Sequence, residues 1–300
     1  MTTQKTIVIE TWNLSREPAA VDRAVGSLLA KLAPASAGAE IIVTHEGLPS
    51  VLRARHPGVR WVELPRGSGY YEHKNVGFAA SAGQVVAFID GDCWPAAGWF
   101  DAIVAPILSG QARVVAGRTV YGGGPARALE TALDFPTFAS RGAPNGTRSF
   151  FANNVAFARD AFPGYPEIPG MFHGQCQVLA LALESRGVVV HHAPLARVEH
   201  AFPDGCREWL RIHLLRGADA SSLAPHVVGS RAPRLAKLTR RAAPLPALAA
   251  IGARAAIETA RLSTAGRSRS SAVATIAAVS VVEAVGAIAE RTVHRRLSPG

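Results

Sequence analysis

The stretch Val85-Val86-Ala87-Phe88-Ile89-Asp90-Gly91-Asp92 decides the fold of this chain. Its five consecutive apolar residues predict a strand that is buried on both faces of a sheet. In open α/β sheets, ligands bind beyond the carboxyl ends of such strands. Two carboxylates one residue apart at that end repel each other, and a hard divalent metal that carries phosphate oxygens would compensate their charge. A polar turn with two unrelated acids is the alternative that the pair alone leaves open.

Strands and helices alternate around this stretch, as in a mostly parallel α/β sheet. The patterns predict strands at 6–10, 41–44, 61–64, 113–121, 188–191 and 196–198, in addition to 85–89. They predict helices at 17–32, 74–82, 99–110, 175–185 and 208–216. No G-x-G-x-x-G follows the first strand, which counts against a dinucleotide-dependent oxidoreductase.

The residues on both sides of the strand add a second pattern. Lys74-Asn75-Val76-Gly77 and Gly83 precede it, and Pro95 and Trp99-Phe100 follow it. The run from Lys74 to Phe100 resembles the central segment of family 2 glycosyltransferases with the GT-A fold. In that family a basic residue and an Asn open a helix, and the following strand ends in an Asp-x-Asp metal motif.

Three further segments resemble the same family in the same order. Thr6-Ile7-Val8-Ile9-Glu10-Thr11-Trp12-Asn13 looks like its first strand and Thr-aromatic-Asn turn, and Val198-Glu199-His200 looks like its late metal-binding His. The segment with Asn153, Asn154 and Arg159 is similar to its acceptor-side segment. The resemblance covers roughly residues 4–203, and it implies a GT-A nucleotide-sugar-binding domain over 1–206.

The resemblance implies a divalent metal, Mn²⁺ or Mg²⁺, at the Asp-x-Asp motif. Asp92 is the expected direct ligand, and Asp90 is expected to contact the metal or the ribose of the donor. His200 is implied as the third ligand, with His191 and His192 as nearby competitors and a structural His at a strand end as the alternative. Such a metal would stabilise the charge that develops on a diphosphate leaving group.

The turn after the first strand and the neighbouring strand ends are expected to hold the nucleotide sugar, because strand carboxyl ends face the ligand crevice. At the end of the second strand, Glu46 stands where the resembled family usually has an Asp that binds the base. Trp12 is expected either to pack on the base or to belong to the core. The candidate donor-binding residues are Thr11, Asn13, Glu46, Lys74, Asn75 and Asp90.

The acceptor side departs from the family pattern at Gly174-Gln175-Cys176-Gln177. The pattern has Glu-Asp after the glycine, and one acid deprotonates the acceptor hydroxyl. Gln175 cannot accept a proton at neutral pH, and Cys176 accepts one only as a thiol of lowered pKa. Three hypotheses follow: His173 is the base, the acceptor is already anionic, as a polyprenyl phosphate is, or the domain binds a nucleotide sugar without turning it over. The other acceptor-side candidates are Asn153, Asn154 and Arg159.

The net charge of +10 is confined to the C-terminal region. Residues 1–206 hold 17 basic and 17 acidic residues, whereas residues 207–300 hold 15 and 5. Two apolar stretches lie among these basic residues, Leu245 to Ile257 and Ala272 to Ala289, and Glu283 interrupts the second. The composition predicts a basic, Ala-rich helical region over 207–300. This region lacks interleaved aromatic residues, which counts against nucleic-acid binding.

We expect the two stretches to form helices that lie on or partly in a membrane, with a helical hairpin packed on the catalytic domain as the alternative. Basic residues that would meet anionic lipid flank them, namely Arg240, Arg241, Arg267, Arg269, Arg291, Arg295 and Arg296. Three widely spaced cysteines suit a reduced compartment, and no signal-peptide-like apolar segment precedes the first strand. The expected location is cytoplasmic, peripheral or weakly anchored at the cytoplasmic membrane.

The sequence therefore predicts an inverting, metal-dependent enzyme that transfers a sugar from a nucleotide-sugar donor to a hydroxyl or a polyprenyl phosphate. Its partners would be the donor, a glycan or lipid-linked acceptor, and a membrane surface contacted through 240–296. A non-catalytic nucleotide-sugar-binding or scaffold protein with a degenerate transferase site is the alternative. A phosphatase that uses Asp-x-Asp as nucleophile and acid is disfavoured, since its acid pair would belong to an early strand.

Overall fold

The computed structural model of the protein covers residues 5–14, 18–33, 38–47, 50–140, 143, 145–235, 242, 244–261 and 269–297. The chain forms two compact units. The sheet unit consists of Met1–Val120, Thr137–Tyr165 and Arg186–Ala201, and the helical unit of Tyr121–Pro136, Pro166–Ser185 and Phe202–Gly300. The helical unit thus includes three segments of the expected 1–206 domain, namely 121–136, 166–185 and 202–206. The domain boundary at 206 stays a prediction.

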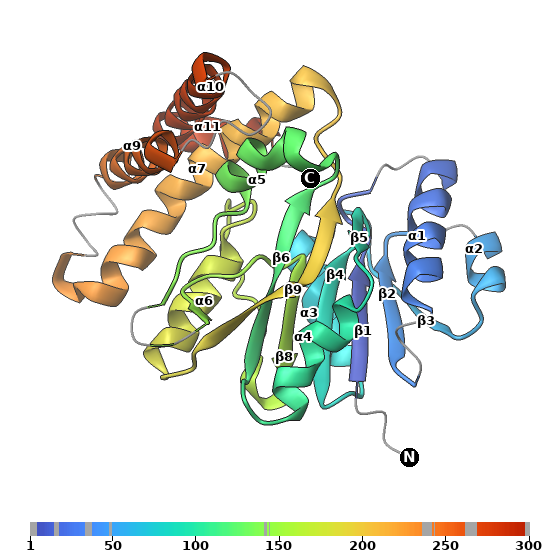
Figure 1. Cartoon of the computed structure of the whole chain (residues 1–300). Coiled ribbons are helices and arrows are strands. Elements are labelled where there is room, and N and C mark those ends of the chain that lie inside the picture. Colours follow the sequence, from blue (N-terminus) through green and yellow to red (C-terminus); the bar gives the residue numbers. More distant parts are fainter. Residues whose placement is uncertain are drawn as a thin grey trace. The chain divides into compact units, whose positions relative to one another are not determined.

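Nine strands of the described residues form one sheet in the order β3-β2-β1-β4-β8-β6-β9-β5, with β7 paired to β9 (Figure 1). They are β1 (Lys5–Glu10), β2 (Glu40–His45), β3 (Val59–Glu63), β4 (Val85–Asp90), β5 (Cys93–Pro95), β6 (Val114–Tyr121), β7 (Gly146–Thr147), β8 (Asn154–Ala158) and β9 (Val190–His200). The first four in the order are parallel, whereas β8 is antiparallel to β4 and β6, and β9 to β5 and β7. The sheet is therefore mixed, and the expectation of a mostly parallel sheet is wrong.

β8 is the strand that changes the sheet from parallel to antiparallel. Its register places Val155 opposite Phe88 and Phe157 opposite Val86, so that apolar side chains from both strands meet. Only Val155 and Phe157 among its five residues are strong strand formers. The local pattern does not predict this strand because its pairing with β4, and not its own propensity, stabilises it.

β9 is a single strand of 11 residues, whereas the sequence predicts two short strands there. His192 and Pro194 interrupt the apolar pattern between the two predicted strands. Different partners hold the two halves, since β7 pairs with Val190 and His191 and β5 pairs with Val198 to His200. The strands expected at 6–10, 41–44, 61–64, 85–89 and 113–121 are confirmed as β1, β2, β3, β4 and β6.

Helices cover both faces of the parallel part of the sheet. They are α1 (Pro18–Leu32), α2 (Ser50–Arg55), α3 (Tyr70–Ala80) and α4 (Trp99–Leu108), and a short 3-10 helix η2 (Arg159–Ala161) follows β8. α1, α2 and α4 share a core with Ile7, Ile9 and Ile89. α3 packs on the opposite face, where a Cβ on Gly77 would lie 2.4 Å from Val8 Cγ1. Both faces of β4 are therefore buried, as the apolar run predicts.

The helical unit consists of η1 (Gly124–Arg127), α5 (Ala128–Asp134), α6 (Gln175–Ser185), α7 (Gly205–Arg231), η3 (Pro233–Leu235), α9 (Pro244–Arg261), α10 (Arg269–Ile288) and α11 (Glu290–Leu297). Within this unit α7, α9, α10 and α11 lie against one another (Figure 1). The helix expected over 208–216 continues to Arg231, because the Ala-rich segment beyond it packs on α10.

α7 and α10 approach each other through two glycines. A Cβ on Gly217 would lie 1.9 Å from the carbonyl oxygen of Glu283, and one on Gly286 would lie 2.1 Å from that of Leu214. The Glu283 side chain is buried beside this crossing, 3.3 Å from His213 Nδ1, and it also pairs with Arg254 of α9. The acid that interrupts the apolar stretch is therefore an internal ion-pair partner.

The two expected apolar helices are confirmed as α9 and α10. In the described part of the chain, α10 alone is long and apolar enough to cross a membrane, with a mean hydropathy of 1.9. Of that apolar window 33% is buried, and a core helix passes the same test, so the membrane remains a proposal. Three of the expected flanking arginines, Arg240, Arg241 and Arg267, lie outside the described residues.

We predict that Gly217→Ala destabilises the helical unit by about 1–3 kcal/mol, because the new methyl group would clash with the α10 backbone. Gly252→Ala in α9 is the matched control, since a Cβ there meets nothing within 4 Å. That variant should be neutral or slightly stabilising. Urea and thermal unfolding measure both, and equal stabilities of the two variants would contradict the close crossing.

Candidate active site

Asp90, the last residue of β4, lies next to Glu10 at the end of β1. Both side chains are buried. Lys74 of α3 is buried too, and its Nζ lies 2.5 Å from Asp90 Oδ1. The Tyr70 hydroxyl donates a hydrogen bond to Asp90 Oδ2 at 2.9 Å. These partners satisfy a carboxylate that would otherwise be costly to bury.

Glu10 adds a second buried carboxyl group to this strand edge. It accepts hydrogen bonds from the backbone N–H of Trp12 at 2.7 Å and from Asn13 Nδ2 at 3.3 Å. Burial and then the charge of Asp90 raise the pKa of Glu10 well above its ordinary value, while Lys74 acts in the opposite direction. Negative charge thus accumulates at the strand ends, where a divalent cation would be favourable.

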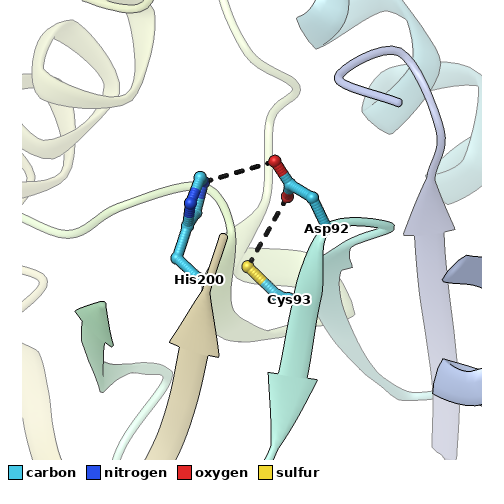
Figure 2. Close-up of side chains that lie close together, drawn as sticks. All are labelled: Asp92, Cys93 and His200. Atoms are coloured by element: carbon cyan, nitrogen blue, oxygen red, sulfur yellow. Dashed lines mark hydrogen bonds and ion pairs between the residues drawn. The ribbon is translucent and has the colours of Figure 1, made fainter. Parts of the chain in front are cut away.

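Asp92, Cys93 and His200 form a cluster just beyond β4 (Figure 2). Cys93 and His200 are opposite residues in the β5–β9 pair, so their side chains lie on the same face of the sheet. His200 Nε2 lies 3.6 Å from Asp92 Oδ2, and Cys93 Sγ lies 3.8 Å from Asp92 Oδ1. The potential ligand atoms of the three residues lie within 4.8 Å of one another.

The surroundings of His200 suit a metal ligand. Its Nδ1 lies 2.6 Å from the carbonyl oxygen of Ala201, and because that oxygen only accepts hydrogen bonds, Nδ1 carries the proton and Nε2 faces Asp92. Backbone carbonyls commonly fix metal-binding histidines in this way. Burial raises the pKa of Asp92, and the charge of His200 opposes this shift. Carboxylate and imidazole groups together fit Mn²⁺, and carboxylates fit Mg²⁺.

The turn after β1 carries the expected donor-side residues Thr11 and Asn13 close to Asp90. The Thr11 hydroxyl donates to the carbonyl oxygen of Thr44 at 3.0 Å and so joins the ends of β1 and β2. Asn13 Nδ2 donates to Asp90 Oδ2 at 3.0 Å. Asn13 of the turn and Lys74 of α3 therefore both contact Asp90 at the end of β4.

Trp12 and Glu46 follow the carboxyl ends of β1 and β2. The Trp12 ring meets the Tyr70 ring edge-on, with centroids 5.9 Å apart. Glu46 accepts a hydrogen bond from the backbone N–H of Gly67 at 3.0 Å, and its other oxygen lies 3.5 Å from His73 Nε2. Neither contact tests their expected roles at the base of the nucleotide.

Two of the expected acceptor residues make internal hydrogen bonds in the sheet. Asn154 accepts from Trp99 Nε1 at 2.8 Å and donates to the carbonyl oxygen of Ala196 at 2.9 Å, so it joins α4 to β9. Asn153 accepts from the Thr119 hydroxyl at 3.0 Å. Both asparagines are buried, and these contacts explain them as structural residues. Their role towards an acceptor stays a prediction.

Asn75 and Arg159 bond to the backbone. The Asn75 amide donates to the carbonyl oxygen of Tyr165 at 3.0 Å and accepts from its N–H at 2.8 Å. Arg159 donates to the carbonyl oxygens of Ser81 and Gly83, at 2.9 Å and 2.5 Å. Nothing in these contacts tests the ligand roles expected for Asn75 and Arg159.

His191 and His192 lie at the opposite end of β9 from His200. His191 pairs with Gly146 of β7, and the backbone N–H of His192 donates to the carbonyl oxygen of Asn145 at 2.6 Å. Burial lowers the pKa of His192. Among the described residues, the metal-type cluster that includes a histidine contains His200 and neither competitor.

The acceptor-side segment His173-Gly174-Gln175-Cys176 belongs to the helical unit and begins α6. Asp219 of α7 fixes this segment, because its carboxylate accepts hydrogen bonds from the N–H groups of Phe172 and His173, both at 2.6 Å. His294 of α11 lies 3.1 Å from the same carboxylate. Burial raises the pKa of Asp219, and these hydrogen bonds oppose the shift.

Gln175 and Cys176 are both buried and make local contacts. Gln175 Nε2 donates to the carbonyl oxygen of Met171 at 3.0 Å, and Cys176 Sγ lies 3.6 Å from the carbonyl oxygen of His173. The structure therefore brings His173, Gln175 and Cys176 together at the start of α6, and their roles in transfer stay a prediction.

Sequence reasoning does not identify four residues of these clusters: Glu10, Tyr70, Cys93 and Asp219. The position of Glu10 offers a signal, because it ends β1 as Asp90 ends the parallel neighbour β4. The position of Cys93 directly after Asp92 offers another. Tyr70 and Asp219 reach their partners only through the packing of α3 and α7, which no short motif encodes.

We predict that Glu10→Gln stabilises the protein more at about pH 8 than at about pH 5 when no divalent metal is added. The raised pKa makes Glu10 keep its proton to a higher pH in the folded state than in the unfolded chain, where it ionises near the ordinary value. Rising pH therefore favours unfolding, and an amide removes this effect. Thermal unfolding measures it, with Glu63→Gln as an exposed control. A pH-independent difference between Glu10→Gln and the wild type would contradict the raised pKa.

Comparison with known proteins identifies relatives of this chain. The pre-mycofactocin glycosyltransferase of Mycobacterium tuberculosis is 25% identical over 211 residues, which cover 65% of this chain and 44% of the relative. The chain thus spans less than half the length of the curated relatives that it matches.

Solved structures share the fold at low sequence identity. A mannosyltransferase from Pyrobaculum calidifontis, in complex with GDP-Man and Mn²⁺, is 15% identical with a TM-score of 0.59, and the match covers 96% of this chain and 87% of that one. Glucosyl-3-phosphoglycerate synthase from Mycobacterium tuberculosis, in complex with Mn²⁺, UDP and phosphoglyceric acid, is 20% identical with a TM-score of 0.51, covering 76% and 78%.

The family model described as glycosyl transferase family 2 matches residues 6–173, from the start of β1 to the segment before α6. This range includes β4, the Asp-x-Asp motif and α3 with Lys74. The chain belongs to glycosyl transferase family 2.

Proposed function

We propose that this protein transfers a sugar from a nucleotide-sugar donor, with inversion at the anomeric carbon and with Mn²⁺ or Mg²⁺ as cofactor. The observation that carries the proposal is the cluster of Asp92 and His200 beside the buried Asp90, at the carboxyl edge of a sheet with the family's strand and motif order. Two further observations support it: structural neighbours contain Mn²⁺ with GDP-Man or with UDP, and one contains Mg²⁺ with UDP.

On the donor side, Asp92 and His200 hold the metal, and Asp90 contacts the metal or the ribose. A bound metal would neutralise the charge of the departing diphosphate. Thr11, Asn13, Lys74 and Asn75 position the nucleotide and Glu46 contacts the base. The hydrogen bonds of Asn13 and Lys74 to Asp90 support the assignments of these three residues, whereas those of Thr11, Asn75 and Glu46 rest on the family resemblance.

On the acceptor side, the protein either uses His173 as the base for a hydroxyl or takes an acceptor that is already anionic, such as a polyprenyl phosphate. The Asp219 carboxylate supports a positioned His173, because it holds the backbone of that residue. Asn153, Asn154 and Arg159 are proposed to lie towards the acceptor. We place the reaction at the cytoplasmic face of a membrane, supported by the basic 207–300 region and by the apolar α10.

A second candidate function is a nucleotide-sugar-binding or scaffold protein without turnover. The observation in its favour is the Gln175-Cys176 pair, which offers no carboxylate where the family pattern has Glu-Asp. Both functions share the donor site and differ in the fate of the donor. Donor hydrolysis or transfer above background by the purified protein would eliminate this second candidate.

We predict that a UDP- or GDP-linked sugar stabilises the protein thermally only when Mn²⁺ or Mg²⁺ is present. A panel of nucleotide sugars, screened by thermal unfolding with the metal and with a chelator, identifies the donor. Asp92→Ala should weaken metal-dependent donor binding by more than about tenfold, because it removes a ligand.

Asp101→Ala provides a matched control for this loss, since Asp101 is an exposed acid of α4 in the same unit. It should bind donor and metal as the wild type does. Unchanged metal-dependent binding in Asp92→Ala would refute the assignment of the motif. Failure of every nucleotide sugar would refute the proposed function.

We predict that His173→Gln lowers transfer to a hydroxyl acceptor by about 10²–10⁴-fold while donor binding stays unchanged, if His173 is the base. Transfer to a polyprenyl phosphate should change little, because that acceptor needs no deprotonation. His191→Gln, at the far end of β9, is the control. Initial rates with both acceptors decide the point, and full hydroxyl transfer by His173→Gln would exclude His173 as the base.

A further inference from the structure

The outer surfaces of α9 and α10 are apolar, and their interior charges point inwards. Arg261 ends α9 and Arg269 begins α10. Apart from these two terminal residues, the charged residues of the two helices are Arg254, Glu258 and Glu283. Glu258 and Glu283 are buried, and Arg254 pairs with Glu283. A surface helix normally shows the opposite arrangement, with charges outside and apolar residues inside.

The exposed side of these helices carries large apolar side chains. Half of the large hydrophobic residues that are exposed in the described chain lie here, namely Leu245, Ile257, Val273, Val281, Val285 and Ile288. Val281, Val285 and Ile288 follow one another at helical spacing and are 64%, 52% and 67% exposed. Alanines occupy much of the remaining exposed surface. We call these six residues and the exposed alanines between them the apolar face.

The two helices run antiparallel, which sets the outline of the apolar face. Ala247 and Ile251 of α9 pack with Ala287 near the end of α10, and Ala255 packs with Ile276 and Val279 nearer its start. Leu245 and Ile288 therefore mark one end of the face, and Ile257 and Val273 mark the other.

Basic residues stand at both ends of the apolar face. Arg261 and Arg269 are exposed where α9 ends and α10 begins. Beyond Ile288, α11 contributes exposed Arg291, Arg295 and Arg296. Arg291 and Arg295 line a cavity of about 410 Å³, whose lining also includes Ser222 and the carboxylate of Glu290.

We infer that the apolar face lies in the plane of an anionic lipid bilayer, with the arginines at its ends contacting lipid phosphates. Apolar area and anionic attraction together give amphipathic segments their membrane affinity. A second copy of the chain fits less well, because the face has arginines at both ends and no exposed carboxylate to pair with them. Two such faces would bring like charges together.

α10 does not cross the bilayer in this arrangement. One side of it packs on α7, with Gly217 and Gly286 at backbone contact, and the carboxylate of Glu283 is held by His213 and Arg254. A spanning α10 would take these charged groups and α7 into the hydrocarbon, which is costly. The inference concerns the helical unit alone. It rests on the proposed membrane location of the protein and not on the proposed donor chemistry.

Vesicle flotation of the full chain tests this inference. We expect binding to phosphatidylcholine vesicles that contain about one third phosphatidylglycerol, and little binding to pure phosphatidylcholine, with a loss at high salt. Val281→Asp combined with Val285→Asp should lower the binding at least about tenfold, because two charges enter the apolar face. Both positions are mostly exposed, so the variant should fold, which circular dichroism checks.

Val51→Asp is the matched control, since Val51 is a 62% exposed valine of α2 in the sheet unit. It should bind vesicles as the wild type does. Arg291→Gln with Arg295→Gln should weaken binding to anionic vesicles by about fivefold or more. Absence of binding to any vesicle, or an equal loss in the control, would overturn the inference.

Two further outcomes separate this arrangement from others. A monomer–dimer equilibrium in solution that the double Asp variant abolishes, without vesicle binding, would assign the face to a second copy and overturn the inference. Alkaline carbonate should release the bound protein from vesicles, and resistance to release would show a spanning helix instead. Donor binding, measured without vesicles, separates a failure of this inference from a failure of the proposed function.

Discussion

The ion pair between Lys74 and Asp90 is the interaction on which the candidate site depends. Glu10 and Asp90 end neighbouring parallel strands, and Asp92 follows two residues later, so that three carboxyl groups gather where the sheet is buried. Such a group of acids is stable only with cations nearby. Lys74 comes from α3, and α3 reaches the sheet only because Gly77 has no side chain against Val8. The close packing of α3 on the sheet therefore places the positive charge of Lys74 among the three carboxyl groups.

The sequence reveals the site wherever a short pattern encodes it, and misses it wherever pairing creates it. β4 and the two acids at its end are predictable. Five consecutive apolar residues predict a strand buried on both faces, and the acids that follow must then lie at its carboxyl end. His200 is predictable only by resemblance, because an antiparallel register brings it to Asp92 from far along the chain. The pattern of β8 is too weak to predict a strand, and its antiparallel pairing with β4 converts the parallel sheet to a mixed one.

The C-terminal helices illustrate a second limit of composition. An apolar stretch with one acid is typical of a spanning helix, of an interfacial helix and of a core helix alike. The side chain of Glu283 separates these three kinds of helix. It pairs with Arg254 and His213 inside the helical unit and does not face the exposed apolar side of α10. Hydropathy averages over the helix and cannot show that the apolar residues are the exposed ones.

The lack of acidic residues at the start of α6 affects which acceptor charge this segment favours. Residues 171–177 contain no carboxylate of their own, and the nearby Asp219 is engaged with two backbone N–H groups and His294. Replacing Glu-Asp by Gln-Cys removes a base, which disfavours a neutral hydroxyl, and also removes negative charge, which favours an anionic acceptor. Both effects act in the same direction. They favour the proposed anionic acceptor, and the proposed hydroxyl acceptor requires His173 as its base.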